Sequence, residues 1–252
     1  MTSALKGFPE KFPVRDDDRR PLRYRIASLA GRVYVRLFSR RRLRIEGVEH
    51  IPRDGPLLVA CNHISNLDPI VFGGYFPRTL FAMAKQEMYV NRPVSWFLGG
   101  CNCIPVNRAG ADRRAVTRAL EVLRRRGRLL VFIEGTRSRD GAMQGAEAGI
   151  GFLARRSGAH ILPAAIAGTD TAGPRRSRLR RREIVLRFGV PFDPGVGRRR
   201  DDRVIADEIA VRVAALLPPE RRGAYADAVT SGPMARAESP GMPSVEGGSA
   251  PP

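Results

Sequence analysis

Residues 56–69 have the sequence PLLVACNHISNLDP, in which a short apolar run passes directly into a polar turn and then a helix start. A run of this length is typical of a buried strand, and the proline at position 69 is typical of the first turn of a helix. Similar apolar runs alternate with helical patterns from residue 43 to about residue 192. This alternation predicts a largely parallel sheet with helices on both faces.

The rest of the chain supplies further strands and helices of the same kind. Strands are predicted over residues 56–61, 80–84, 103–106, 129–133, 161–167 and 184–188. Helices are predicted from the cap Asp112 to Gly127, and over residues 149–157 and 201–217. We therefore expect a single α/β domain over residues 43–229, with a largely parallel mixed sheet flanked by helices.

Two terminal segments and one helix flank this domain. Residues 1–21 contain three prolines and a charged run, which indicates a flexible arm. Residues 230–252 are rich in Gly, Pro and Ser and nearly lack large apolar side chains, which indicates a disordered tail. Between the arm and the domain, residues 22–42 are predicted to form a basic amphipathic helix.

The apolar stripe of this helix allows two interpretations. It consists of residues spaced three and four apart: Leu22, Ile26, Leu29, Val33 and Leu37. In the first interpretation the stripe packs on the domain and the arginines are simply solvated. In the second, the helix lies in a membrane interface, where acyl chains contact the stripe and anionic headgroups contact the arginines.

The composition indicates an anionic partner and a location inside the cell. The chain has 252 residues with 44 Lys and Arg against 25 Asp and Glu, a formal net charge of +19. No apolar run reaches the length of a transmembrane helix, and no secretory signal peptide is visible. Three cysteines fit a reducing compartment. We expect a peripheral protein at the cytoplasmic face of the cell membrane, in contact with an anionic membrane surface.

One pair of residues after the strand 56–61 is a candidate for acid–base chemistry. His63 stands five residues before Asp68, at the point where a strand ends and a helix begins. This is where α/β proteins place their sites. A tight turn can return the carboxylate to one ring nitrogen, which fixes the tautomer and leaves the other nitrogen free as a base. A histidine that is only hydrogen-bonded locally in a loop is the alternative.

A second polar block follows the strand 129–133. It has the sequence Glu134-Gly135-Thr136-Arg137-Ser138. Glycine lets a ligand approach the backbone, the hydroxyls offer hydrogen bonds, and the guanidinium offers a bidentate fork for phosphate. The block therefore predicts an anion-binding loop, and Arg108 at the end of the strand 103–106 adds a further cation.

Four blocks, in this order and spacing, resemble the glycerolipid (lysophospholipid) acyltransferase superfamily of the 1-acylglycerol-3-phosphate acyltransferase type. The resemblance covers about residues 43–192. It is carried by Asn62, His63 and Asp68; by Gly100, Ile104 and Arg108; by Phe132 with residues 134–138; and by Pro163.

The resemblance implies transfer of an acyl group from acyl-CoA or acyl-carrier protein to the free hydroxyl of 1-acylglycerol-3-phosphate or a related lysophospholipid. It implies that His63 is the general base and that Asp68 orients it, with no covalent acyl-enzyme. We expect no metal and no cofactor; acyl-CoA or acyl-carrier protein is a co-substrate. The implied substrate-binding residues are Asn62, Arg108, Glu134, Gly135, Thr136, Arg137 and Ser138.

The chain departs from the family pattern at two positions. Ile133 stands where relatives often have proline, a mild change because proline there mainly fixes the backbone. Glu147 lies where relatives commonly have a Lys-containing segment. Because a cation is replaced by an acid, the sequence does not decide whether the acceptor headgroup is a simple phosphomonoester.

Three other functions are weighed against the acyltransferase interpretation. A nucleic-acid binder would use the arginine-rich residues 175–182, but aromatic residues are not interleaved with that run, so bases would find no stacking platform. A metal site would use Cys61, His63, Cys101 and Cys103, at spacings tighter than usual. A membrane scaffold with an inactive site would not explain why the polar blocks are all present.

Overall fold

The computed structural model describes residues 21–38, 43–107, 112–170, 183–195 and 200–231. Within them, seven strands form one sheet in the order β1-β7-β6-β2-β5-β3-β4. The strands are β1 Leu43–Glu46, β2 Leu57–Cys61, β3 Phe81–Lys85, β4 Cys103–Val106, β5 Arg128–Phe132, β6 His160–Ala167 and β7 Ile184–Phe188. Neighbouring strands are parallel except for β6 and β7. The predicted α/β class with a largely parallel mixed sheet is confirmed.

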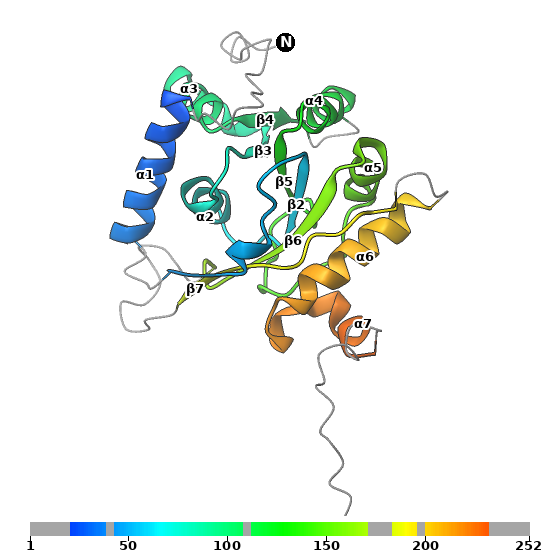
Figure 1. Ribbon diagram of the computed structural model, residues 1–252. Helices are drawn as coiled ribbons and strands as arrows, with labels where there is room; N and C mark the ends of the chain where they lie inside the picture. The colour runs from blue at the N-terminus through cyan, green and yellow to red at the C-terminus, as the bar shows by residue number, and fades with distance from the viewer. Residues whose placement is uncertain (1–20, 39–42, 108–111, 171–182, 196–199, 232–252) are drawn as a thin grey trace, which may run out of the picture.

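Helices cover both faces of this sheet (Figure 1). They are α1 Leu22–Phe38, α2 Asp68–Tyr75, α3 Arg92–Gly100, α4 Arg113–Arg124, α5 Ala148–Ser157, α6 Asp202–Ala215 and α7 Ala226–Ser231. Short 3-10 turns are η2 Val48–His50, η3 Gln86–Met88, η4 Pro219–Arg221 and η5 Gly223–Tyr225. Side chains of α2 and α1 share one apolar core, and side chains of α4, α5 and α6 share the core on the other face.

Strand β2 explains why residues 57–61 are all apolar and do not alternate with polar residues. All five of its residues are buried. Successive side chains point to opposite faces of a strand, so Leu58 and Ala60 enter the core beneath α4, α5 and α6. Leu57, Val59 and Cys61 enter the core beneath α2. A central strand between two helical layers therefore has to be apolar at every position.

The six predicted strands agree with the structure to within one residue at either end. Strand β1 and the helices α3 and α7 were not predicted. Strand β1 is short, and its side chains are only partly buried, so it lacks a strong apolar signal. Helix α3 begins after the cap Asn91, whose side chain accepts a hydrogen bond from the Val94 amide. The predicted cap of α4 is present, because the Asp112 carboxylate accepts from the amides of Arg114 and Ala115.

The ends of the chain are only partly described. Residues 1–20 and 232–252, which include most of the predicted arm and tail, lie outside the described residues, as does the segment 39–42 of the predicted basic helix. Helix α7 runs to Ser231, two residues beyond the predicted domain boundary. Among the described helices, none combines the length and the apolar character needed to cross a membrane.

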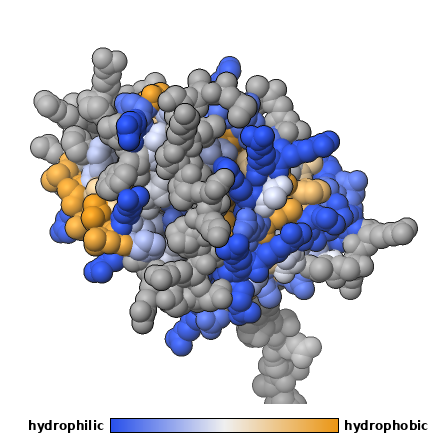
Figure 2. Space-filling view, turned by 90° about the horizontal axis from the view of Figure 1, so that it is seen from above, coloured by the Kyte–Doolittle hydropathy of each residue, from blue (hydrophilic) through white to orange (hydrophobic). Residues whose placement is uncertain are grey.

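Helix α1 packs through a different face from the predicted apolar stripe. Its buried residues are Tyr24, Ala27, Ser28, Gly31 and Val35. These are mostly small, and they bring the helix close to α2, where the Ser28 hydroxyl donates to the Gly73 carbonyl at 2.7 Å. The large apolar residues of the stripe are left exposed, from 46% for Val33 to 69% for Leu22. Figure 2 shows an apolar patch at the edge of the molecule where α1 lies, with hydrophilic side chains around it.

Candidate active site

The predicted polar blocks meet at one edge of the sheet. Strand β2 lies between β5 and β6 and is parallel to both, with Cys61 opposite Phe132 and Ala164. The carboxyl ends of these strands therefore lie side by side. His63 follows β2, the 134–138 block follows β5, and the chain beyond β6 reaches the same place.

His63 and Asp68 form a hydrogen-bonded pair at this edge. The Nδ1 atom of His63 lies 2.8 Å from Oδ2 of Asp68. The same oxygen accepts hydrogen bonds of 2.8 Å from the backbone amides of Ile64 and Ser65. Because the carboxylate is an acceptor in these contacts, Nδ1 is the donor, and in the neutral imidazole the lone pair is therefore on Nε2.

The five-residue spacing is explained by the turn between the two residues. Asp68 is the first residue of α2 and is fully buried. Its carboxylate satisfies amides of the turn that would otherwise be unpaired. The turn is therefore folded around the carboxylate, which fixes the His63 ring in one orientation.

The His63 ring lies against Phe132 at the wall of a cavity. The two ring centroids are 4.0 Å apart and the rings are nearly parallel, at 17°. The His63 side chain is 11% exposed, and within the described residues Nε2 has no hydrogen-bond partner. The ring is therefore held on one face by Phe132 and at Nδ1 by Asp68, while Nε2 is available to a ligand.

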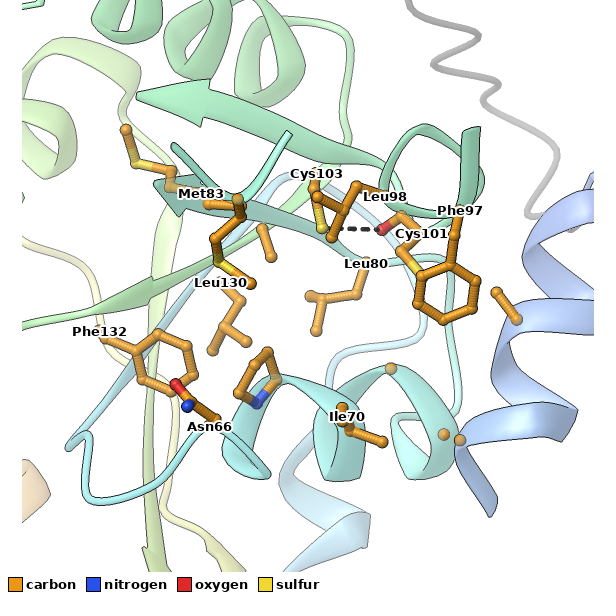
Figure 3. A pocket seen from close by; sticks show the side chains of 18 of the residues that line it. Asn66, Ile70, Leu80, Met83, Phe97, Leu98, Cys101, Cys103, Leu130 and Phe132 are labelled. Carbon is orange, nitrogen blue, oxygen red and sulfur yellow. Dashed lines mark hydrogen bonds between the residues drawn. The ribbon is translucent and has the colours of Figure 1, made fainter. Parts of the chain in front are cut away.

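The cavity has a volume of about 790 Å³ and is lined mainly by apolar side chains. Figure 3 shows side chains from the start of α2, from α3 and from strands β3, β4 and β5 around this space; the labelled apolar ones include Ile70, Leu80, Met83, Phe97, Leu98 and Leu130. Helix α1 closes another part of the wall with Tyr24, Ala27 and Tyr34. Near His63 the lining becomes polar, with Thr136 and Arg137. The cavity therefore has a few polar groups, His63 among them, in a wall that is mainly apolar.

Glu134 supports His63 through the backbone. One of its oxygens accepts from the His63 amide at 2.8 Å, and the other accepts from the Gln144 amide at 2.9 Å. The residue is 3% exposed. Burial raises the pKa of the Glu134 carboxyl, and the two amide hydrogen bonds oppose that rise. Both oxygens are thus committed to the protein.

Asn62 and Ser138 are likewise bonded within the protein. The Asn62 amide group donates to the Ile166 carbonyl and accepts from the Ile166 amide, which links the end of β2 to β6. The Ser138 hydroxyl donates to Asp140 and accepts from the Gly141 amide. These residues shape the site, and their side-chain polar atoms are not directed at the cavity.

The middle of the 134–138 block faces the cavity. Gly135 has a φ of +65°, and a Cβ there would lie 3.0 Å from a side-chain carbon of Glu147, so glycine suits the position. Thr136 and Arg137 are exposed and line the cavity beside His63. Arg108, the further predicted cation, lies outside the described residues.

Sequence reasoning missed one residue of the site. Thr169 follows β6, is fully buried, and donates its hydroxyl to Oδ1 of Asp68 at 2.5 Å. It lies 101 positions from Asp68, and no local pattern marks it. The only hint in the sequence is its place, directly after Gly168 at the end of an apolar run.

The candidate metal ligands are not brought together. Cys61 lies on β2 and Cys103 on β4, and β5 and β3 separate these strands in the sheet. Burial raises the pKa of the Cys61 thiol well above its usual range and that of Cys101 to about 11. Among the described residues, no group of three or more His, Cys, Asp or Glu side chains could hold a metal ion. The arginine-rich residues 175–182 lie outside the described residues.

Comparisons with known proteins agree on one family. The family model described as Acyltransferase matches residues 42–167. A 1-acyl-sn-glycerol-3-phosphate acyltransferase of Bacillus subtilis (strain 168) is 26% identical over 164 residues, which cover 65% of this chain and 80% of that protein. The chloroplastic 1-acyl-sn-glycerol-3-phosphate acyltransferase LPAT1 of Arabidopsis thaliana is 26% identical over 169 residues, 63% of this chain but only 45% of that protein.

A solved structure gives the same result. The crystal structure of the 1-acyl-sn-glycerophosphate (LPA) acyltransferase PlsC from Thermotoga maritima superposes with a TM-score of 0.61 at 28% identity. The match covers 74% of this chain and 76% of that one. It includes a comparable α/β architecture, so the likeness extends from sequence to fold.

Proposed function

The chain belongs to the Acyltransferase family, and on this basis we propose that it transfers a fatty acyl group to the free hydroxyl of 1-acylglycerol-3-phosphate. The donor is acyl-CoA or acyl-carrier protein, a co-substrate rather than a resident cofactor. The observation that carries the proposal is the His63–Asp68 hydrogen bond beside a cavity that is apolar along most of its wall. The names of the similar proteins support this acceptor.

The chemistry uses His63 as a general base. Nε2 removes the proton from the acceptor hydroxyl as its oxygen bonds to the thioester carbonyl carbon. The tetrahedral intermediate then expels the thiolate, which takes the proton back from the imidazolium as the ester forms. Asp68 stabilises the imidazolium between these steps, so no covalent acyl-enzyme and no further reactant is needed.

The residues of the site divide into two roles under this proposal. Arg137 and Thr136, which line the cavity, bind the phosphate and glycerol of the acceptor. The backbone at Gly135 contributes as well, because glycine lets the ligand approach it. Asn62, Glu134 and Ser138, first predicted to bind substrate, are reassigned to positioning because their polar side-chain atoms bond within the protein. Arg108 is retained as a phosphate contact.

The apolar part of the cavity receives an acyl chain. Its lining from α2, α3 and β3 can bury a hydrocarbon chain. This burial favours binding in proportion to the apolar area removed from water. Helix α1 forms part of that wall through Tyr24 and Ala27 and turns its large apolar residues outward. We place the protein peripherally at the cytoplasmic face of the membrane, with this outer face against anionic lipid.

Acyl transfer itself is the test. Purified protein is supplied with 1-acylglycerol-3-phosphate and either acyl-CoA or acyl-carrier protein, while thiol release and lipid products are measured by absorbance and mass spectrometry. We expect diacylglycerol phosphate with at least one donor, and a loss of about 10²- to 10⁴-fold in His63→Ala. His160→Ala is the matched control, because His160 is exposed at the opposite end of β6. Equal rates for both variants, or no product with either donor, would refute the proposal.

A further inference from the structure

The two oxygens of Asp68 are bonded very differently. Oδ2 accepts three N–H donors, from the His63 ring and from the amides of Ile64 and Ser65. Oδ1 accepts the Thr169 hydroxyl. Asp68 and Thr169 are both fully buried, so water cannot replace that hydroxyl without a rearrangement.

The backbone around Thr169 is built to hold it in this place. Gly168 has a φ of +85°, and a Cβ there would lie 2.1 Å from the Glu183 carbonyl oxygen, so only glycine turns the chain here at this packing distance. On the other side, Asp170 accepts from Arg221 at 2.9 Å. Arg221 also donates to the Gly141 carbonyl, in the loop that follows the 134–138 block.

We propose that Thr169 is a positioning residue for the acyl transfer, the third member of a Thr169–Asp68–His63 relay. Its hydroxyl fixes the rotation of the Asp68 carboxylate, so that Oδ2 stays in line with Nδ1 of His63. This inference rests on the proposed function. Without the Thr169 hydroxyl, only the contacts of Oδ2 resist rotation of the carboxylate, so the orientation of the imidazole is less narrowly defined although the Oδ2–Nδ1 hydrogen bond remains.

The Thr169 hydroxyl also weakens the electrostatic attraction between the Asp68 carboxylate and the protonated His63 ring. A donor on Oδ1 draws electron density from the carboxylate, so its removal strengthens the attraction of Asp68 for the imidazolium. His63 would then bind its proton up to a higher pH. Other charged or titratable groups near the pair are Cys61 and Glu134, with Arg137 and Lys85 in the cavity and Asp170 and Arg221 beyond Thr169.

Two substitutions separate the hydroxyl from the shape of the side chain. Thr169→Val keeps the volume and removes the hydroxyl, whereas Thr169→Ser keeps the hydroxyl. We expect kcat to fall roughly tenfold in the valine variant, equivalent to about 1.4 kcal/mol of barrier, with KM nearly unchanged and with the serine variant within about twofold of wild type. Thr79→Val is the matched control, because the Thr79 hydroxyl is buried without a hydrogen-bond partner among the described residues.

A second measurement does not depend on turnover. The chain has three histidines, so the His63 ring can be assigned in ¹⁵N-histidine NMR spectra by comparison with His63→Gln. We expect the His63 titration midpoint, and the acidic limb of the kcat profile, to move to higher pH by roughly half a unit in Thr169→Val and not in Thr79→Val. If the wild type transfers no acyl group, the proposed function fails, yet the NMR titration still tests the relay.

Two results would overturn the assignment of Thr169. One is a valine variant with wild-type kcat and an unchanged His63 titration. The other is a serine variant that loses as much activity as the valine variant, since the hydroxyl would then not be the group that matters. The serine variant keeps the test valid even if Thr169→Val fails to fold.

Discussion

Glu134 shows how a buried carboxylate can serve a site without touching its ligand. Its two oxygens bond the amides of His63 and Gln144, so it ties the end of β2 to the loop that follows β5. An amide side chain could accept only one of these hydrogen bonds, because its nitrogen is a donor. The other backbone N–H would then face a second donor instead of an acceptor.

We therefore predict that Glu134→Gln lowers both stability and activity. The unpaired amide should cost about 1–3 kcal/mol of unfolding free energy, and the displaced His63 should reduce kcat at least tenfold. Urea unfolding and thiol-release assays measure the two effects. Glu121→Gln is the control, because Glu121 forms an exposed ion pair with Arg125 and should change neither by a comparable amount. A stable, fully active Glu134→Gln would show that the amide contacts are dispensable.

Arg137 is predicted to act on the acceptor rather than on the acyl donor. It lines the cavity together with His63, and a guanidinium there can hold a phosphate in two hydrogen bonds. Arg137→Ala should raise the KM for 1-acylglycerol-3-phosphate and also lower kcat, because a loosely held phosphate misplaces the hydroxyl. Steady-state kinetics with each substrate varied in turn decide the matter. A change confined to the KM of the donor would place Arg137 in the donor site.

Local sequence was enough to propose His63 and Asp68 as a pair, but it gave Asn62 and Glu134 a substrate-binding role instead of a supporting one, and it missed Thr169. The two residues belong to one turn, so their five-residue spacing is enough to predict that the side chains meet. Asn62, Glu134 and Thr169 meet their partners across 104, 71 and 101 positions, respectively. Contacts of that length depend on the order of strands in the sheet, which no short pattern specifies.

At the scale of an element, α1 shows where periodicity alone is ambiguous. The helix has two candidate faces, one with large apolar residues and one with Tyr24, Ala27, Ser28 and Gly31. The small residues allow close contact with α2, where the Ser28 hydroxyl and Arg32 reach the carbonyls of Gly73 and Gly74. Hydrophobicity scales favour the large residues, so the packed face could not be selected from the sequence.

The cap of α4 gives a pH-dependent prediction at the same scale. Hydrogen bonds from the amides of Asn107, Ala115 and Arg114 lower the pKa of the Asp112 carboxyl. A lowered pKa in the folded state means that the cap stabilises the protein above the unfolded pKa of about 3.9 and that this contribution is lost as pH falls further. Asp112→Ala should therefore cost about 1 kcal/mol at pH 7, measured by urea unfolding.

The same comparison repeated at lower pH checks the sign. The difference between wild type and Asp112→Ala should shrink as pH falls below 4, because the wild-type carboxyl becomes protonated and accepts amide hydrogen bonds less well. A difference that stays constant over this range would mean that the carboxylate charge contributes nothing to the cap.

At the scale of the whole molecule, α1 connects the cavity to the outer surface. One side of the helix lines the cavity through Tyr24, Ala27 and Gly31, and the opposite side exposes the apolar stripe. An acyl chain entering from a bilayer would therefore have to cross only the thickness of this helix layer to approach His63. The arginines on α1 add attraction to an anionic surface, at about 1 kcal/mol for each one near the lipid.

Vesicle binding should consequently need both the stripe and the charge. Leu29→Asp combined with Val33→Asp should lower the fraction of protein that sediments with anionic vesicles at least tenfold, because it removes apolar contact and adds like charge. High salt should weaken wild-type binding, since it screens the arginines. Val204→Asp is the control: Val204 is 54% exposed on α6, which covers the opposite face of the sheet. If the double variant and this control bind equally, the exposed stripe of α1 is not the lipid contact, and the membrane-facing surface has to be sought on another part of the molecule.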